Sequence, residues 1–294
     1  MNLRLFVVLF FICGVAFPGA KSYSEPAPLT LVFGINSTDS PKVIAQKIFP
    51  ILDVLESDLE RRLLRPVKIK FKVFRTYEES IKAFVDGAVD FGRLCPASYV
   101  LAKQQNPLIQ LLAMENKNGQ KRFNGLIIVR KDSSFQNLSD LKATNFAFGN
   151  RVSTIGRYLA QLELMKAGVC SKNLKKFDYL HRHDNVFTGV ATGRYDAGSL
   201  KESTFHKRNE KNKDLRILYS FHNVTKPWLV RGGLDENIYH TLRLAMLDLK
   251  DQEAFKKLNI KGFFPSSHQE YKIIEEAMLN TDQFDNCKFA MSAE

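Results

Sequence analysis

The feature that most limits the fold of this chain is an alternation of short apolar runs with amphipathic segments. Leu29–Ile35 is an apolar run typical of a buried strand, and the polar loop Asn36–Pro41 follows it. Apolar residues then recur at three- and four-residue steps from Ile48 to Leu63, which predicts one face of a helix that contains Pro50. Because this order of strand, loop and helix repeats, we expect an α/β fold with mostly parallel sheets flanked by helices.

The same patterns predict the later elements. Residues 67–73 alternate apolar residues with lysines, which is typical of a half-buried strand at a sheet edge. Thr76–Glu79 has the capping-box pattern of a helix start, and Pro96 suits the first turn of another helix. Further strands are expected at residues 89–94, 108–113, 125–129, 145–148, 177–180, 196–200 and 215–219, and helices at 153–168, after 183, at 238–249 and at 271–279. The sequence shows no internal repeat.

Residues 1–20 have the order of a secretory signal peptide. Arg4 precedes the apolar run Leu5–Phe17, and small residues follow at positions 19 and 20. The run is short for a membrane-spanning helix, so cleavage is favoured over a retained anchor. The residues around Cys13 match a lipoprotein site poorly. We therefore expect an exported, periplasmic mature chain.

Composition narrows the class of protein further. The mature chain of about 270 residues is long enough for two modest domains, and a hydrophobic content of 45% excludes general disorder. The net charge of +12 favours anionic partners. Its lysines are scattered and are not interleaved with aromatic residues, so a solvated basic surface is the preferred interpretation and no nucleic acid is expected.

The sequence gives little support to an enzyme, a metal or a cofactor. The mature chain keeps Cys95, Cys170 and Cys287, an odd number that permits at most one internal disulfide; Cys170 with Cys287 is one candidate pair. No Cys-x-x-Cys or Cys/His metal spacing occurs, and no Gly-x-Ser-x-Gly elbow. Nothing in the sequence places Ser153 with His183 as a catalytic triad.

Four loops between strands and helices are rich in small polar groups: Ser37–Ser40, Pro96–Tyr99, Ser153–Thr154 and His183–Asp184. Parallel sheets bind ligands at the carboxyl ends of their strands, where such loops lie. Hydroxyl groups, free backbone N–H groups and the helix dipole at a helix start all favour an anion. For each loop taken alone, a simple helix cap is the preferred interpretation. Their order along the chain favours a shared site for a tetrahedral oxyanion.

This order resembles the phosphate, phosphite and phosphonate receptors of bacterial ABC importers, a branch of the periplasmic binding proteins. The resemblance covers residues 29–271, and its most specific part is Val89–Ala102, where Cys95 stands at a usual glycine. The stretch Phe146–Gly156 is similar to the phosphorus-group loop of that family. His183-Asp184, followed by Gly193–Gly198, is similar to two further family elements.

The resemblance implies a two-lobed fold and a partner. Lobe 1 would contain residues 24–125 and 226–294, and lobe 2 residues 126–225, with crossings near 124–125 and 224–227. Such receptors close on their ligand by hinge motion and then dock on an ABC permease. We expect a monomer. The alternative is a ligand-sensing partner of a membrane histidine kinase or another signalling receptor.

The resemblance also implies roles for single residues. Tyr77 would close on the oxyanion, Ser153 and Thr154 would hold its oxygens, and His183 would contact the same group. Ser98 and Tyr99 belong to the family's Gly-Pro-x-Ser-Tyr turn and are candidate ligand residues. Glu202 lies near the glutamate that holds the amine of aminophosphonates. The candidate ligand-binding residues are therefore Tyr77, Ser98, Tyr99, Ser153, Thr154, His183 and Glu202.

Three residues depart from the family pattern. Ile155 replaces a hydroxyl donor, Phe123 replaces a ligand tyrosine of some members, and Lys226 replaces an aspartate that faces the ligand's amine. A lysine would repel an ammonium group and favour additional negative charge. We therefore hypothesise that the ligand is phosphate, phosphite or an acidic organophosphorus compound rather than 2-aminoethylphosphonate.

Other conspicuous residues have plainer interpretations. Packing is the preferred role for Trp228 and for the ring of Tyr99, and Asp196 is expected to hold a turn by accepting backbone N–H bonds. Asp184 either orients His183 or caps a helix. Solvent exposure is the preferred interpretation of Arg93 and Arg151.

Overall fold

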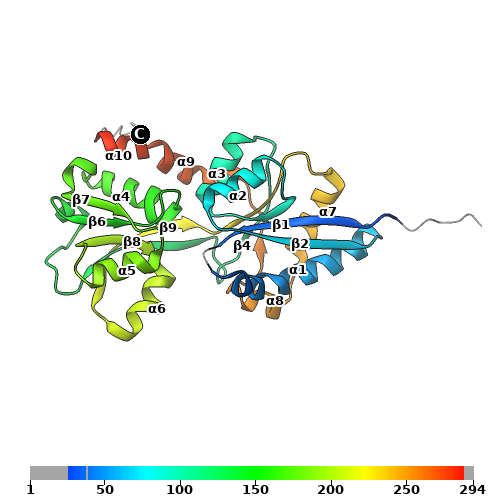
Figure 1. The fold of residues 1–294 in the computed structure, drawn as a ribbon, viewed down its shortest axis with the longest axis horizontal. Helices are drawn as coiled ribbons and strands as arrows, with labels where there is room; N and C mark the ends of the chain where they lie inside the picture. The colour runs from blue at the N-terminus through cyan, green and yellow to red at the C-terminus, as the bar shows by residue number, and fades with distance from the viewer. Residues whose placement is uncertain (1–25, 38, 288–294) are drawn as a thin grey trace, which may run out of the picture.

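The computed structural model describes residues 26–37 and 39–287, so the expected signal peptide lies outside the described residues. The fold consists of two α/β lobes, each built on one sheet (Figure 1). Lobe 1 contains β1 (Leu29–Asn36), β2 (Val67–Phe74), β3 (Phe91–Arg93), β4 (Gln110–Glu115), β10 (Pro227–Val230) and β11 (Phe263–Phe264), in the order β11-β4-β10-β3-β1-β2. Lobe 2 contains β5 (Arg122–Arg130), β6 (Asn145–Phe148), β7 (Lys176–Tyr179), β8 (Ala197–Lys201) and β9 (Leu215–Val224), in the order β7-β6-β8-β5-β9.

Strand direction explains where the loops gather. Strands β1, β2 and β3 are parallel, and so are β6, β7 and β8. The chain enters lobe 2 as β5 and returns to lobe 1 as β10. Strand β5 is antiparallel to both of its neighbours, and so is β10. Because entering strands start at the junction of the lobes, the parallel strands must end there. Most strands of each sheet therefore run in the same direction, as expected. Many neighbouring pairs are nevertheless antiparallel, because β5, β10 and β11 run the opposite way.

The two lobes share a local device that the sequence analysis did not identify as a repeat. Asp90 and Asp196 each lie in the pattern Gly-x-x-Asp-x-Gly. The Asp90 carboxylate accepts a hydrogen bond from the Val32 N–H at 2.8 Å, and the Asp196 carboxylate accepts one from the Asn145 N–H at 2.7 Å. Each aspartate thus fixes the register of two neighbouring parallel strands, which confirms the structural role expected for Asp196.

Helices cover both faces of each sheet. In lobe 1, α1 (Pro41–Leu63), α7 (Glu236–Asp248) and α8 (Gln252–Lys256) enclose one apolar cluster, and α1 continues through Pro50. The opposite face carries α2 (Tyr77–Val85) and α3 (Pro96–Gln105). In lobe 2, the π-helical segment η2 (Thr154–Leu159) continues into α4 (Ala160–Lys166), while α5 (His183–Ala191) and α6 (Glu202–Asn212) cover the other face.

The C-terminal helices join the lobes. Figure 1 shows α9 (Lys272–Leu279) over the junction, where it contacts α3 of lobe 1 and η2 of lobe 2. Next, α10 (Thr281–Asn286) packs on α4, and a disulfide links Cys170 to Cys287. The candidate disulfide is thereby confirmed. The expected lobe 1 includes residues 226–294, but α10 within that range packs on α4 of lobe 2 and is followed by this covalent bond to lobe 2.

Two segments connect the sheets. The first spans residues 116–121, before the expected crossing at 124–125, since β5 already begins at Arg122. The second is Thr225-Lys226, between β9 and β10. Within the described residues, no helix is both long and apolar enough to cross a membrane.

Candidate ligand-binding site

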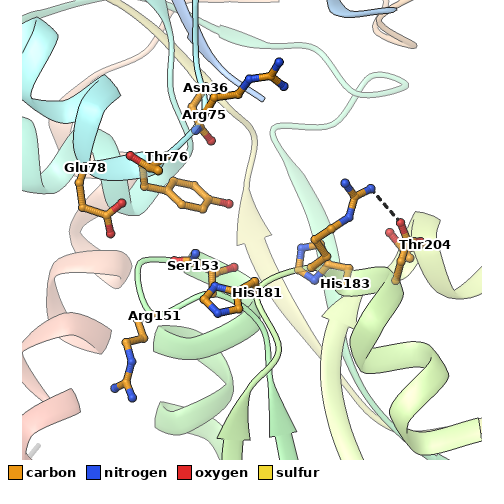
Figure 2. Close-up of a pocket in the computed structure, with 13 residues that line it drawn as sticks. Asn36, Arg75, Thr76, Glu78, Arg151, Ser153, His181, His183 and Thr204 are labelled. Carbon is orange, nitrogen blue, oxygen red and sulfur yellow. Dashed lines mark hydrogen bonds and ion pairs between the residues drawn. The ribbon is translucent and has the colours of Figure 1, made fainter. Parts of the chain in front are cut away.

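A cavity of about 470 Å³ lies where the strand ends of the two lobes face each other. Lobe 1 lines it with residues that follow β1 and β2, and lobe 2 mainly with residues that follow β6 and β7 (Figure 2). The lobe 1 residues are Asn36, Arg75, Thr76, Tyr77 and Glu78, and the lobe 2 residues include Asn150, Arg151, Ser153, His181, Arg182, His183 and Asp184. This is the position at which open α/β sheets bind ligands.

Tyr77 lines the cavity from the first turn of α2. Thr76 caps this helix: its hydroxyl accepts a hydrogen bond from the Glu79 N–H at 3.1 Å, and the Glu79 carboxylate accepts one from the Thr76 N–H. The predicted capping box is confirmed, and it fixes the backbone from which Tyr77 projects. Burial raises the pKa of Tyr77 well above its ordinary value, so the phenol stays protonated and is a neutral hydrogen-bond donor.

Ser153 lines the cavity from the start of η2. Its hydroxyl oxygen accepts a hydrogen bond from the Gly156 N–H at 2.9 Å and retains its own proton to donate. A Cβ atom on Gly156 would lie 2.8 Å from the Gly149 Cα, so this loop folds too tightly for a larger residue. The first N–H groups of a helix have no partner within it, and the helix dipole adds positive potential. This end of η2 therefore attracts an anion.

Thr154 and Ser98 lie at the contact between the lobes. The Thr154 hydroxyl oxygen accepts a hydrogen bond from the Ala97 N–H, in the first turn of α3, at 3.0 Å. Ser98 is fully buried, with its hydroxyl oxygen 3.0 Å from the Cys95 sulfur. The bond between Thr154 and Ala97 crosses from lobe 2 to lobe 1, so the structure shows the lobes closed. Neither Thr154 nor Ser98 is among the residues that line the cavity.

His183 lines the cavity at the start of α5, which has no side-chain cap. Its Nδ1 atom is buried and has no hydrogen-bond partner among the described residues. Burial, with the nearby Lys201 and Lys226, lowers the pKa of His183 to about 4, so the ring is neutral at neutral pH. An unpaired buried nitrogen is unfavourable, and a polar group of a ligand would relieve it.

Positive side chains outnumber negative side chains around the cavity. Asp184 is engaged by two arginines, since its carboxylate lies 3.0 Å from Arg208 Nε and 3.2 Å from the Arg182 guanidinium. Burial raises the pKa of Asp184, but these arginines outweigh it and the pKa lies below its ordinary value. Arg75 is exposed at the lobe 1 rim. The cavity therefore combines one compensated carboxylate and the exposed Glu78 with cations and helix starts, an environment that suits an anion.

Two predicted ligand residues lie elsewhere. Tyr99 is buried in the core as its ring packing predicted, and its hydroxyl lies 3.0 Å from His268 Nδ1. Glu202 accepts a hydrogen bond from the Asn124 side chain at 3.2 Å. Neither residue lines the cavity.

The preferred interpretation of Arg93 is wrong. Its side chain is only 12% exposed and makes a paired ion contact with Glu115, which is 6% exposed. The indole N–H of Trp228 donates to the same carboxylate at 3.3 Å, and the ring is fully buried, which confirms its packing role. Burial raises the pKa of Glu115, but Arg93 outweighs it and the net direction is downward. Arg93 therefore joins β3, β4 and β10. Arg151 is exposed as expected, over the Tyr179 ring.

The family departures lie near the crossings. Lys201, at the end of β8, places its ammonium 5.0 Å from the centre of the Phe123 ring, and Ile155 is buried against Gly125. Burial lowers the pKa of Lys226 to about 7 and that of Lys201 to about 8. The sequence analysis missed Lys201 and Arg75, although both lie at the carboxyl ends of strands and that position was a usable signal.

This fold and cavity define a two-lobed binding protein that encloses a small solute between its lobes. Residues 33–271 match the family of periplasmic substrate-binding proteins of phosphonate ABC transporters, and the chain belongs to that family. It is 26% identical over 281 residues to the probable ABC transporter phosphite binding protein PhnD1 of Prochlorococcus marinus, covering 84% of this chain and 93% of that protein.

Solved structures agree with this assignment. PhnD1 from Prochlorococcus marinus in complex with methylphosphonate superimposes with a TM-score of 0.70, at 26% identity, covering 86% of this chain and 98% of that one. XAC2383 from Xanthomonas citri bound to chloride has a TM-score of 0.74 at 21% identity, covering 88% and 99%, and shows the shared fold.

Proposed function

We propose that this protein captures a small phosphorus oxyanion (phosphate, phosphite or a phosphonate) in the periplasm and presents it to the permease of an ABC importer. The observation that supports this most directly is the meeting of three helix starts, those of α2, η2 and α5, at one cavity between the lobes. The relatives named for phosphite and methylphosphonate support the same ligand class.

The donors at these helix starts suit a tetrahedral anion. Tyr77, Ser153 and His183 are neutral groups that donate hydrogen bonds without bringing a charge of their own, and they approach from both lobes. Each helix dipole adds about 0.3–1 kcal/mol of favourable potential for an anion. Oxygens that point in several directions would satisfy donors from both lobes together, so the ligand itself would stabilise the closed form.

Closure would take place about the two connections, residues 116–121 and 225–226. In this proposal the lobes keep the expected division near residues 125 and 226, except that the C-terminal helix α10 moves with lobe 2. The protein acts as a monomeric carrier after removal of its signal peptide, without catalysis and without a cofactor.

A double variant tests the oxyanion site. Ser153→Ala removes a hydroxyl donor from the cavity, and Thr154→Ala removes the hydroxyl that bonds the Ala97 N–H across the closed lobes. We expect the double variant to bind methylphosphonate and phosphite roughly a hundredfold more weakly in isothermal titration calorimetry. Because Ser153 also caps η2, Asn137→Ala, which removes the cap of the short 3-10 helix Leu138–Leu141 and does not line the cavity, is the control and should leave the dissociation constant unchanged. An unchanged dissociation constant in a folded double variant would contradict the assignment.

A further inference from the structure

Four cations and one acid lie together where the chain crosses between the lobes. Arg93 ends β3, Lys201 ends β8, Lys117 and Lys226 lie in the two connections, and Glu115 ends β4. Each of the three lysines interacts electrostatically with both Arg93 and Glu115. We call these five residues the hinge cation cluster. It contains three more positive than negative charges.

The acid of the cluster is already occupied. Both carboxylate oxygens of Glu115 are engaged by Arg93, and one also accepts the indole N–H of Trp228. Among residues 26–37 and 39–287, the ammonium groups of Lys201 and Lys226 have no hydrogen bond or ion pair; only the Phe123 ring lies under Lys201. Burial of ammonium groups without partners is strongly unfavourable, and their lowered pKa values reflect this.

Two buried polar atoms without a partner among the described residues belong to residues close to Lys226 in the sequence. Thr225 Oγ1 and Asn223 Oδ1, both at the second connection, are buried and have no partner in the described chain, as is also true of His183 Nδ1. His183 links this region to the cavity, because it lines the cavity and because Lys201 and Lys226 both lower its pKa. A folded protein rarely leaves several buried polar atoms unpaired at one place without a ligand to bind them.

We propose that the hinge cation cluster binds a second anionic group of the ligand, a carboxylate or a second phosphonate, while the phosphorus oxyanion lies at Tyr77, Ser153 and His183. This inference rests on the proposed function and adds the chemical class of the ligand's far end. A second anion would pair with Lys201 and Lys226, and the hydroxyl of Thr225 could donate to the same group. An ammonium group at this position would meet like charge and lose affinity.

The structural role of the hinge cation cluster does not account for its lysines. Arg93 alone neutralises Glu115 and holds it against Trp228, so the joining of β3, β4 and β10 requires no lysine. Lys201 ends β8 of lobe 2, and Lys226 lies in the connection between β9 and β10, so neither belongs to this strand junction. Their positive charges therefore remain available for a ligand in the closed form.

Three compounds with the same phosphonate group and different far ends test the proposal. Isothermal titration calorimetry would compare 3-phosphonopropionate, methylphosphonate and 2-aminoethylphosphonate. We expect the carboxylate compound to bind about ten- to a hundredfold more tightly than methylphosphonate, as charge-assisted hydrogen bonds allow, and the amine to bind most weakly. Lys226→Met should remove most of this preference and change the binding of methylphosphonate less than about threefold.

The controls separate this proposal from the proposed function. Lys207→Met removes an exposed lysine on α6 and should leave all three affinities unchanged. Lys201→Met is a second variant that should act as Lys226→Met does, and thermal melting checks that each variant is folded. If methylphosphonate binds as tightly as 3-phosphonopropionate, or if Lys226→Met weakens both equally, the second-anion site is overturned and the phosphorus site remains. If no phosphorus compound binds, both proposals fail.

Discussion

The two ends of the closed cleft provide positive potential in different ways. At the helix-start end, Tyr77, Ser153 and His183 are neutral, and favourable potential comes from backbone N–H groups and helix dipoles. At the hinge end, Lys201 and Lys226 are half-buried amines, and burial together with the neighbouring cations lowers their pKa values. Without a ligand, and among the described residues, the neutral end leaves His183 Nδ1 unpaired, whereas the hinge end leaves two cations without a counter-ion, which is the more unfavourable of the two. Under the two proposals, one end recognises the phosphorus group and the other selects among the compounds that carry it.

The ends also differ in what they do for the fold. Helix caps at the cavity stabilise only their own helices, and each substitution there should mainly affect binding. At the hinge end, Arg93, Glu115 and Trp228 connect three strands of lobe 1 at the point where the chain leaves for lobe 2. Substitutions of these three residues should mainly affect stability. The predictions below test this division, beginning with the largest effect.

The largest effect should follow from Glu115→Gln. Removing this negative charge leaves Arg93 buried without its counter-ion, next to two further cations, and breaking a buried pair costs about 3–5 kcal/mol. We therefore expect the free energy of unfolding in urea to fall by about 3 kcal/mol, because glutamine keeps some of the hydrogen bonds.

Two variants control this measurement. Glu253→Gln breaks an exposed pair with Lys256 on α8 and should change stability by less than about 1 kcal/mol. If Glu115→Gln does not fold, the double variant Arg93→Met with Glu115→Met, which removes both charges together, should recover a measurable transition. A loss below about 1 kcal/mol for Glu115→Gln would show that the pair is not the main support of this region.

A smaller effect, on binding alone, is expected from Tyr77→Phe. The ring keeps its packing, and only the phenol donor at the helix-start end is lost. A hydrogen bond to a charged group contributes about 1.5–3 kcal/mol, so methylphosphonate should bind roughly ten- to a hundredfold more weakly. Tyr219→Phe is the control, since its hydroxyl donates to Glu163 at 2.9 Å on lobe 2 and does not line the cavity. Equal binding by both variants would remove Tyr77 from the site.

Local signals made the helix-start end predictable from sequence. A capping box such as Thr76–Glu79 is defined by residues three positions apart, and its geometry forms within one turn. Strand and helix alternation similarly predicts which loops follow carboxyl ends, and this indicated Ser153 and His183, whereas Tyr77 was implied by the family resemblance. Family resemblance then distinguished these loops from ordinary caps. The α/β class was predictable for the same reason, because each β-α unit carries its own pattern, whereas the two-lobed arrangement was implied by the family resemblance.

The hinge end was not predictable in this way. Arg93 and Glu115 are 22 residues apart and meet only because β3 and β4 both flank β10, a strand that arrives more than a hundred residues later. No local pattern reports that arrangement, so Arg93 was interpreted as exposed. The attachment of α10 to lobe 2 depends likewise on a contact between residues 170 and 287. The sequence marks Lys226 only as a departure from the family pattern. Which cations lie near it depends on the topology, which no local pattern shows.

The smallest effect should come from the titration of Lys226 in the ligand-free protein. Its pKa of about 7 in the folded state lies below the ordinary value of 10.5, so between these pH values the unfolded chain holds more protons than the folded one. The contribution of Lys226 to stability therefore improves as pH rises through this window and worsens as pH falls toward 7. Lys226→Met lacks this dependence. We expect it to be more stable than the parent protein at pH 6 by on the order of 1 kcal/mol, because solvent screens this partly exposed side chain.

Urea unfolding at pH 6, 8 and 10 measures this difference directly. The advantage of Lys226→Met should be largest at pH 6 and should shrink by pH 10, where the parent's lysine is largely neutral in the folded state. Lys201 is present in both proteins and cancels from the comparison, and Lys207→Met should show a constant difference near zero. A constant gap for Lys226→Met, or one that grows with pH, would mean that Lys226 is well solvated. The empty protein would then not be destabilised by Lys226, so an anion would have no unfavourable charge to neutralise at the hinge end. The contrast between the two ends of the cleft would disappear.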